Sequence, residues 1–213
     1  MNHPMNHGKT VVAFGAAAVL AIGLTACSST SSEQPSDASP TASSMMNGSA
    51  TDIAFAQGMI PHHQQAVEMA DAALDPASDA SPEVKKLAKQ IKGAQDPEIQ
   101  QMTQWLQQWG APTTMPGASG DMDSMDHGGH DMGGIAMSGM MTAEQMQQMR
   151  QATGSAFDTM WLQMMIAHHE GAITMSEQVK AGSSNEDVTA LANAIITGQR
   201  AEIETMRKDL AQS

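Results

Sequence analysis

Hydrophobic residues along the chain recur at intervals of three and four positions in four long stretches, and this spacing is typical of amphipathic helices. The stretches cover about residues 52–74, 82–109, 142–180 and 187–211. No stretch shows the strict alternation of polar and apolar residues that indicates a β-strand. The pattern therefore predicts an all-α fold.

Residues with known preferences for helix ends stand at the borders of these stretches. We expect helices to start at Thr51 or Asp52, at Ser81 followed by Pro82, at Thr142 paired with Gln145, and at Asn185. Gly110 is placed to close the second helix. Pro61 predicts a kink or a fresh start in the first helix, Pro97 a kink in the second, and Gly154 a break in the third.

The chain contains an internal repeat that centres on a doubled histidine. The stretch "MIPHHQQAVEM" at 59–69 matches "MIAHHEGAITM" at 165–175, and the helices that follow also match, for example at Gln95 and Gln199. Each half is therefore expected to be a helix hairpin, and two hairpins pair most simply as a four-helix bundle. The expected domain spans 51–211, with a first hairpin at 51–110, a loop at 111–141 and a second hairpin at 142–211.

The N-terminal residues predict export and a membrane anchor. An apolar run at 11–26 is too short for a comfortable membrane span and has the size of a signal-peptide core. It ends in "LTAC", which resembles the lipobox of bacterial lipoproteins. We therefore expect a signal peptide at 1–26, a lipid on Cys27 and a disordered tether at 27–50, which place a lipoprotein on the outer, periplasmic face of the cytoplasmic membrane. The alternative is an ordinary secretory signal with an incidental cysteine.

Charge and composition narrow the range of partners. Aspartate and glutamate number 23 against 10 lysines and arginines, so the net charge is −13 at pH 7. This charge repels the phosphates of nucleic acids, and we expect no nucleic-acid partner. Methionine is unusually frequent at 21 residues, whereas Cys27 is the only cysteine. Soft ligands in the mature domain must therefore be thioethers.

The repeated motif combines imidazole nitrogens with thioether sulfurs at helical spacing. Met59 lies three residues before His62 and four before His63, so it can sit beside either ring. This ligand set suits copper, and thioethers favour Cu(I), with Cu(II) as the second state. The candidate ligands in the bundle are His62, His63, His168, His169, Met59, Met69, Met164, Met165 and Met175. Two alternatives stay open: the methionines fill the core, and the histidine pairs form a buried polar network that holds the bundle together.

The loop between the hairpins gives independent evidence for metal binding. Residues 115–141 are rich in glycine, methionine, histidine and aspartate and show no helical period, so their methionines have no core to fill. The cluster resembles the Met-rich tracts with which periplasmic copper proteins capture copper. The candidate ligands are His127, His130, Met122, Met125 and Met132. The alternative is a low-complexity segment without a specific ligand.

Enzyme chemistry finds little support in the sequence. The residues three positions before the four histidines are Met59, Ile60, Met165 and Ile166, so the Glu-x-x-His pairs of di-iron bundles are absent. The His-Glu-x-x-His spacing of zinc hydrolases is absent as well. We therefore expect a copper-binding protein that is not an enzyme. The alternatives are a copper-dependent redox enzyme of the cuprous oxidase type and a structural lipoprotein without a metal role.

Two motifs together resemble a known bacterial family. "MIPHHQQAVEMA" and "FDTMWLQMMIAHHEGAITMS", each followed by Gln-x-x-Glu-Ile-x-x-Met, are similar to domain-of-unknown-function family three-hundred-and-five, which includes periplasmic copper-binding proteins of the CopM type. The resemblance covers 51–110 and 142–211. It implies a ferritin-like four-helix bundle outside the cytoplasm that binds copper, and sometimes silver, through histidine and methionine. The matching positions are His62, His63, Met59 and Met69, and His168, His169, Met165 and Met175.

These expectations combine into one hypothesis about function. The protein is expected to be anchored outside the cytoplasmic membrane, where it sequesters or relays Cu(I) or Cu(II) and contributes to copper tolerance. A copper donor or acceptor protein is the expected macromolecular partner, in addition to the membrane that holds the lipid.

Overall fold

The computed structural model of the protein describes residues 48–114 and 138–212, which all belong to one compact unit, Ser39–Ser213. Several sequence predictions fall outside the described residues. They are the signal peptide at 1–26, the lipid on Cys27, most of the tether at 27–50, and the loop ligands at His127, His130, Met122, Met125 and Met132. These remain predictions.

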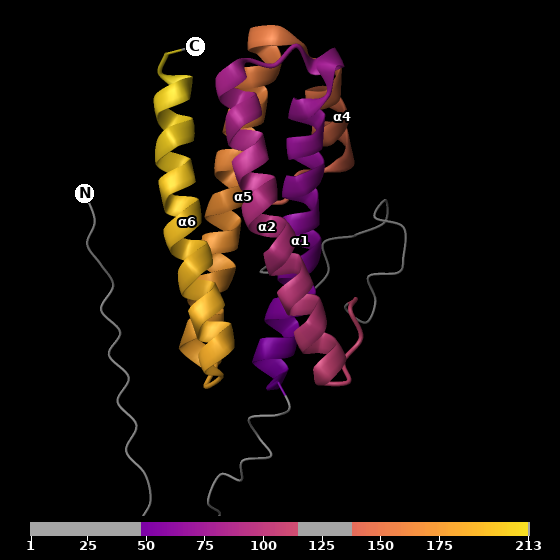
Figure 1. Ribbon diagram of the computed structural model, residues 1–213, viewed down its shortest axis with the longest axis vertical. Helices are drawn as coiled ribbons and strands as arrows, with labels where there is room; N and C mark the ends of the chain where they lie inside the picture. The colour runs from indigo at the N-terminus through magenta and orange to yellow at the C-terminus, as the bar shows by residue number, and fades with distance from the viewer. Residues whose placement is uncertain (1–47, 115–137, 213) are drawn as a thin grey trace, which may run out of the picture. The chain divides into compact units, whose positions relative to one another are not determined.

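The described residues form helices and contain no strand, which confirms the all-α prediction (Figure 1). The helices are α1 (Ala50–Leu74), the 3₁₀ turn η2 (Pro76–Ser78), α2 (Pro82–Gln108), α4 (Ala143–Gln151), α5 (Gly154–Gly182) and α6 (Glu186–Leu210). Within 48–114 and 138–212, no helix has both the length and the apolar character that a membrane crossing requires.

Local side-chain chemistry explains most helix ends. Ser81, Thr142 and Asn185 cap α2, α4 and α6 as predicted. The predicted start of α1 is wrong, because Ser49 is the N-cap and accepts a hydrogen bond from the amide of Asp52. The Asp52 carboxylate accepts the Ser49 amide in return at 2.9 Å, so this acid completes a capping box from inside the first turn.

Neither internal proline ends its helix. Pro61 lies within α1 and Pro97 within α2, and both side chains are on the exposed face. Both helices continue through their prolines without a fresh start. The break predicted at Gly154 is confirmed, because α4 ends at Gln151 and α5 begins at Gly154 with φ +60°.

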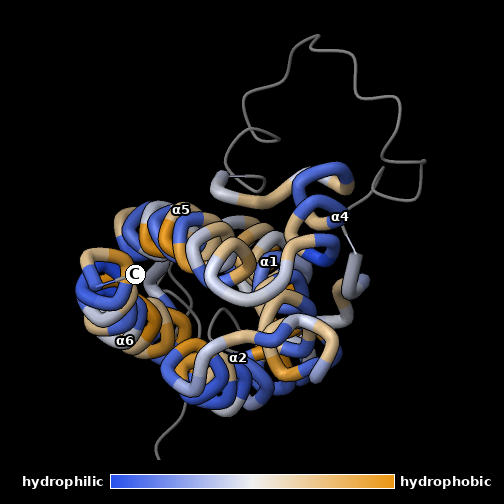
Figure 2. Tube along the Cα trace, turned by 90° about the horizontal axis from the view of Figure 1, so that it is seen from above, coloured by the Kyte–Doolittle hydropathy of each residue, from blue (hydrophilic) through white to orange (hydrophobic). Residues whose placement is uncertain are grey.

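The long helices form a bundle of two hairpins. α1 packs along α2, α5 packs along α6, and the hairpins meet mainly where α1 contacts α5. Viewed along the bundle, the order around the ring is α1, α2, α6, α5 (Figure 2). The repeat of the sequence is therefore a repeat of hairpins, as predicted, and the short helix α4 is an addition that packs on α5.

The apolar interior is divided into two clusters. The Trp161 cluster contains residues 66–73 of α1 and 157–165 of α5, whereas the Trp105 cluster contains residues 55–60 of α1 and 172–179 of α5. Residues early in one helix thus pack with residues late in the other, so α1 and α5 cross in antiparallel directions. The doubled histidines lie between the two clusters on both helices.

The Trp161 cluster should carry much of the stability. Trp161 is fully buried, and its indole Nε1 donates to the Met69 carbonyl oxygen at 2.9 Å. We expect Trp161→Ala to lower the free energy of unfolding by about 3–5 kcal/mol, because the change leaves a cavity and removes the hydrogen bond to the Met69 carbonyl. Urea unfolding followed by circular dichroism measures this value. Trp109→Ala is the control, since Trp109 is partly exposed at the end of α2, and an equal loss in both variants would contradict the assignment.

Candidate metal centre

All four histidines of the repeated motif are buried with no exposed surface. α1 supplies His62 and His63, and α5 supplies His168 and His169. Adjacent residues on a helix point about 100° apart, so the two rings of one pair cannot share a direction. One ring of each pair accordingly faces the other hairpin, and the second ring turns into its own hairpin.

His62 and His168 are the rings that meet across the hairpins. Their centroids are 3.8 Å apart and the ring planes are inclined by 40°. The centroids of His168 and His169 are 6.4 Å apart, so neighbouring rings on α5 lie much less close than these two. The antiparallel crossing of α1 and α5 thus brings together equivalent positions of the repeat.

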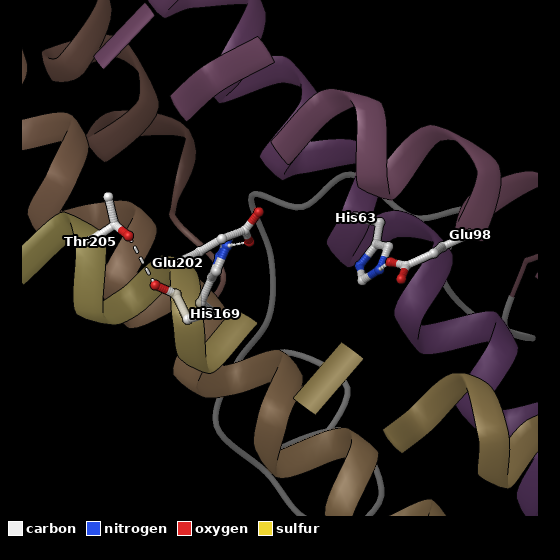
Figure 3. Close-up of polar contacts among 6 residues, drawn as sticks. His63, Glu98, His169, Glu202 and Thr205 are labelled. Atoms are coloured by element: carbon white, nitrogen blue, oxygen red, sulfur yellow. Dashed lines mark hydrogen bonds and ion pairs between the residues drawn. The ribbon is translucent and has the colours of Figure 1, made fainter. Parts of the chain in front are cut away.

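His63 and His169 each pair with a carboxylate of their own hairpin (Figure 3). His63 Nε2 lies 2.7 Å from Glu98 Oε2 on α2, and His169 Nε2 lies 2.8 Å from Glu202 Oε2 on α6. Figure 3 shows His63 with Glu98 and His169 with Glu202 as two separate pairs, each within its own hairpin. A neutral imidazole that donates Nε2–H to a carboxylate keeps its lone pair on Nδ1, the arrangement found in many metal-binding histidines.

Five imidazole nitrogens of this layer have no hydrogen-bond partner although they are buried. They are Nδ1 of His62, His63, His168 and His169, and Nε2 of His168. Both amide atoms of Gln95 and the amide oxygen of Gln199 are also buried without a partner. Each unpaired buried polar atom costs about 1–3 kcal/mol. The layer is therefore an unfavourable arrangement for packing alone, and its nitrogen lone pairs fit a bound metal ion.

Burial keeps the two facing rings neutral. Desolvation lowers the pKa of His62 from 6.5 to about 3, against a hydrogen bond to the Ser138 carbonyl that raises it. Desolvation also lowers the pKa of His168 well below 6.5, and the nearby His62 ring adds to this shift. The His62 carbonyl opposes the shift only as a weak acceptor, because neither nitrogen of His168 reaches hydrogen-bond geometry. Neutral rings offer lone pairs to a metal at pH 7.

The predicted methionine ligands divide between the two apolar clusters. Met59 and Met175 lie in the Trp105 cluster, and Met69 and Met165 lie in the Trp161 cluster. Met164 is only partly buried against the Trp161 cluster. These side chains therefore flank the histidine layer on both sides, and they are core residues as well as candidate ligands.

The chemistry of a metal in this layer is restricted by the available donors. In residues 48–114 and 138–212, no three histidine, cysteine, aspartate or glutamate side chains are grouped so that they could hold a metal ion. Facing imidazoles with thioethers nearby instead match the soft donors that Cu(I) prefers.

Sequence reasoning missed part of this layer. Glu98 and Glu202, and Gln95 and Gln199, occupy equivalent positions of the repeat on the inward stripes of α2 and α6. A polar residue repeated on an apolar stripe was the available signal for their role beside the histidines. Ser138, whose carbonyl contacts His62 Nε2 at 2.9 Å, had no such signal, because it lies in a loop.

Comparison with known proteins places these residues in a family. The family model described as "Domain of unknown function (DUF305)" matches residues 52–210. A putative secreted DUF305 protein from Streptomyces coelicolor is 29% identical, with 76% of this chain and 93% of that chain covered and a TM-score of 0.65. No curated protein matches the chain.

Structures of a metal-bound protein are also similar to this chain. CopM in the Cu(II)-bound form is 32% identical over 76% of this chain and 96% of that chain, with a TM-score of 0.59. CopM in the Cu(I)-bound form is 31% identical over the same shares, with a TM-score of 0.55.

The neutral state of His62 predicts how the metal-free protein responds to acid. The folded state keeps His62 unprotonated down to about pH 3, whereas an unfolded histidine takes up a proton near 6.5. Lowering the pH through the window from 6.5 to about 3 therefore favours the unfolded state, which binds the proton. The stability that His62 contributes as a neutral ring is fully present above pH 6.5 and is lost as the pH falls. We expect the free energy of unfolding to fall with pH less steeply in His62→Leu than in the wild type, as measured by urea unfolding across the window. Identical slopes would contradict the buried neutral ring.

The unpaired nitrogens of His168 predict an unusual mutational effect. Because neither ring nitrogen has a partner, we expect His168→Leu to leave the metal-free protein at least as stable as the wild type, with a gain of about 1 kcal/mol. His169→Leu is the matched variant on the same helix, and it should destabilise the protein because Glu202 loses its partner. Thermal unfolding measures both. A marked loss of stability in His168→Leu would instead favour the histidines as a stabilising polar network.

Proposed function

The chain belongs to the DUF305 family, and on this basis we propose that it is a copper-binding protein that sequesters or relays copper outside the cytoplasm. The observation that carries the proposal is the set of five buried imidazole nitrogens without partners. Their number and burial make a purely structural role for the layer costly. A metal ion bound to the lone pairs of these rings would reduce this cost.

The donor set favours copper over other metals. His62 and His168 present neutral nitrogens at the crossing of the hairpins, and methionine sulfurs lie in the clusters on either side. The nearest carboxylates already bond to His63 and His169, so they orient rings and are not free ligands. Nitrogen and thioether donors at low coordination number suit Cu(I). The similar CopM structures with Cu(I) and Cu(II) support both oxidation states.

The remaining sequence features support the proposed location and role. The predicted signal peptide and Cys27 support a lipoprotein on the outer face of the cytoplasmic membrane, and the similar Streptomyces coelicolor protein is described as secreted. The residues before α4 supply additional thioethers and imidazoles for capture. A buried site holds copper away from other reactants, which is the chemistry of tolerance. Relay of the copper to a partner protein is the second part of the proposal, and the proposal includes no catalytic step.

Affinity for Cu(I) tests the proposed bundle site. We expect the double variant His62→Ala/His168→Ala to bind Cu(I) at least about tenfold more weakly than the wild type, measured by competition with a chromophoric chelator under anaerobic conditions. The matched control is Gln64→Ala/Glu170→Ala, at exposed positions of the same helices that are also equivalent in the repeat. Equal affinity of the wild type and the histidine variant would contradict the site. Turnover of Cu(I) with oxygen by the wild type would identify a redox enzyme instead.

The capacity for copper tests the role of the segment before α4. We expect replacement of Met122, Met125, Met132, His127 and His130 by serine to lower the number of copper ions bound per chain. The melting temperature of the metal-free protein should not change. Equilibrium dialysis with metal analysis gives the stoichiometry. An unchanged stoichiometry would assign all bound copper to the bundle.

A further inference from the structure

A short segment fastens the end of the inter-hairpin connection onto the histidine layer. We define the strap as Ser138–Met141, the residues that precede Thr142 and α4. The side-chain amide of Gln65 on α1 donates to the Met141 carbonyl at 2.8 Å and accepts the Met141 amide at 2.8 Å. This pair of hydrogen bonds between the Gln65 side chain and the Met141 backbone fixes one end of the strap on α1.

The other end of the strap lies so close to α5 that no side-chain atom fits between their backbones. A Cβ atom on Gly171 would stand 2.0 Å from the Ser138 carbonyl oxygen and 2.6 Å from its carbon. Gly139, which has φ +77°, would place a Cβ 2.5 Å from the Ala167 carbonyl oxygen. Glycine at both positions is therefore a condition for this contact between the strap and α5.

The same position of the repeat holds the strap from both hairpins. Gln65 follows His63 by two residues, and Gly171 follows His169 by two residues. In the first copy, Gln65 forms hydrogen bonds with the strap. In the second copy, Gly171 has no side chain, so the backbone of the strap can lie directly against α5. The two copies of the motif therefore differ at the position that contacts the strap, and this position lies next to the doubled histidine in both copies.

The strap makes the two facing histidines inequivalent. The Ser138 carbonyl lies 2.9 Å from His62 Nε2, and a carbonyl can only accept. The proton of neutral His62 therefore sits on Nε2, and its lone pair is on Nδ1, which is buried without a partner. His168 has no such bond at either nitrogen. One ring of the facing pair is held in a single tautomer by a hydrogen bond, whereas neither nitrogen of the other ring has a partner with hydrogen-bond geometry.

We propose that the strap is a positioning element of the metal centre, because it fixes His62 in the tautomer that presents Nδ1 as a ligand. His62 then binds the metal only through Nδ1, whereas His168 can present either nitrogen. The inference rests on the proposed function, since it assigns the ligand atom of His62 at the same site and the contact that selects that atom. Gly171, Gln65 and Ser138 act through His62 and do not touch the metal.

Gly171→Ala tests the strap at its contact with α5. The added Cβ meets backbone atoms of Ser138, so the strap must move away from α5, while alanine favours the helix by up to about 1 kcal/mol. Gly198→Ala is the matched control, because Gly198 is also inside a helix and has open space at its Cβ. Gln65→Ala is a second variant, which removes the other attachment, and the adjacent exposed Gln64→Ala is its control.

Two readouts on the full-length protein decide the proposal. The ¹⁵N shifts of the His62 ring in the metal-free protein report its tautomer, and Cu(I) competition reports affinity. We expect Gly171→Ala and Gln65→Ala to lose the single Nε2–H tautomer and to bind Cu(I) about tenfold more weakly, while both controls match the wild type.

The possible failures are distinguishable. An unchanged His62 tautomer in Gly171→Ala, or a changed tautomer with unchanged Cu(I) affinity, would overturn the role of the strap and leave the proposed function standing. A wild type that binds no Cu(I) would overturn the proposed function together with the strap's role in it. The tautomer measurement needs no metal, so it tests the strap's bond to His62 independently.

Discussion

The interior of this bundle depends on four imidazole rings that are held in an apolar environment with five of their nitrogens unpaired. Nδ1 of His62 and both nitrogens of His168 are buried without a partner, and desolvation keeps these two rings neutral. A core selected for stability alone would place leucine or isoleucine here. The loss of stability from these unpaired nitrogens is explained if the same atoms bind a soft metal ion.

The antiparallel repeat explains how such a layer is built. Because α1 and α5 cross in opposite directions, a motif that occurs once in each hairpin meets its own copy at the crossing point. The apolar residues on either side of the motif form two closed clusters, which hold the crossing in register. Glu98 and Glu202 then fix the outer rings within their hairpins, and the strap fixes His62 at the centre.

The sequence was sufficient for the helices and for the identity of the histidines, and insufficient for their grouping. Hydrophobic spacing and the caps at Ser81, Thr142 and Asn185 located the helices, because these signals are local. The start at Ser49 was missed because Asp52 suits both the N-cap and the third helical position. The contact of His62 with His168 depends on the direction in which the hairpins cross, which no local pattern contains. For the same reason, the division of Met59 and Met165 between two clusters could not be predicted.

X-ray absorption at the copper edge is the most direct measurement of whether these lone pairs bind copper. The sample is the Cu(I)-loaded protein in which Met122, Met125, Met132, His127 and His130 are serine, so that bundle copper dominates. We predict imidazole scattering at low coordination number, together with thioether sulfur, and loss of the imidazole signal in His62→Ala/His168→Ala. A copper environment without imidazole, or one that the double variant leaves unchanged, would contradict the assignment of the buried histidine layer as the metal centre.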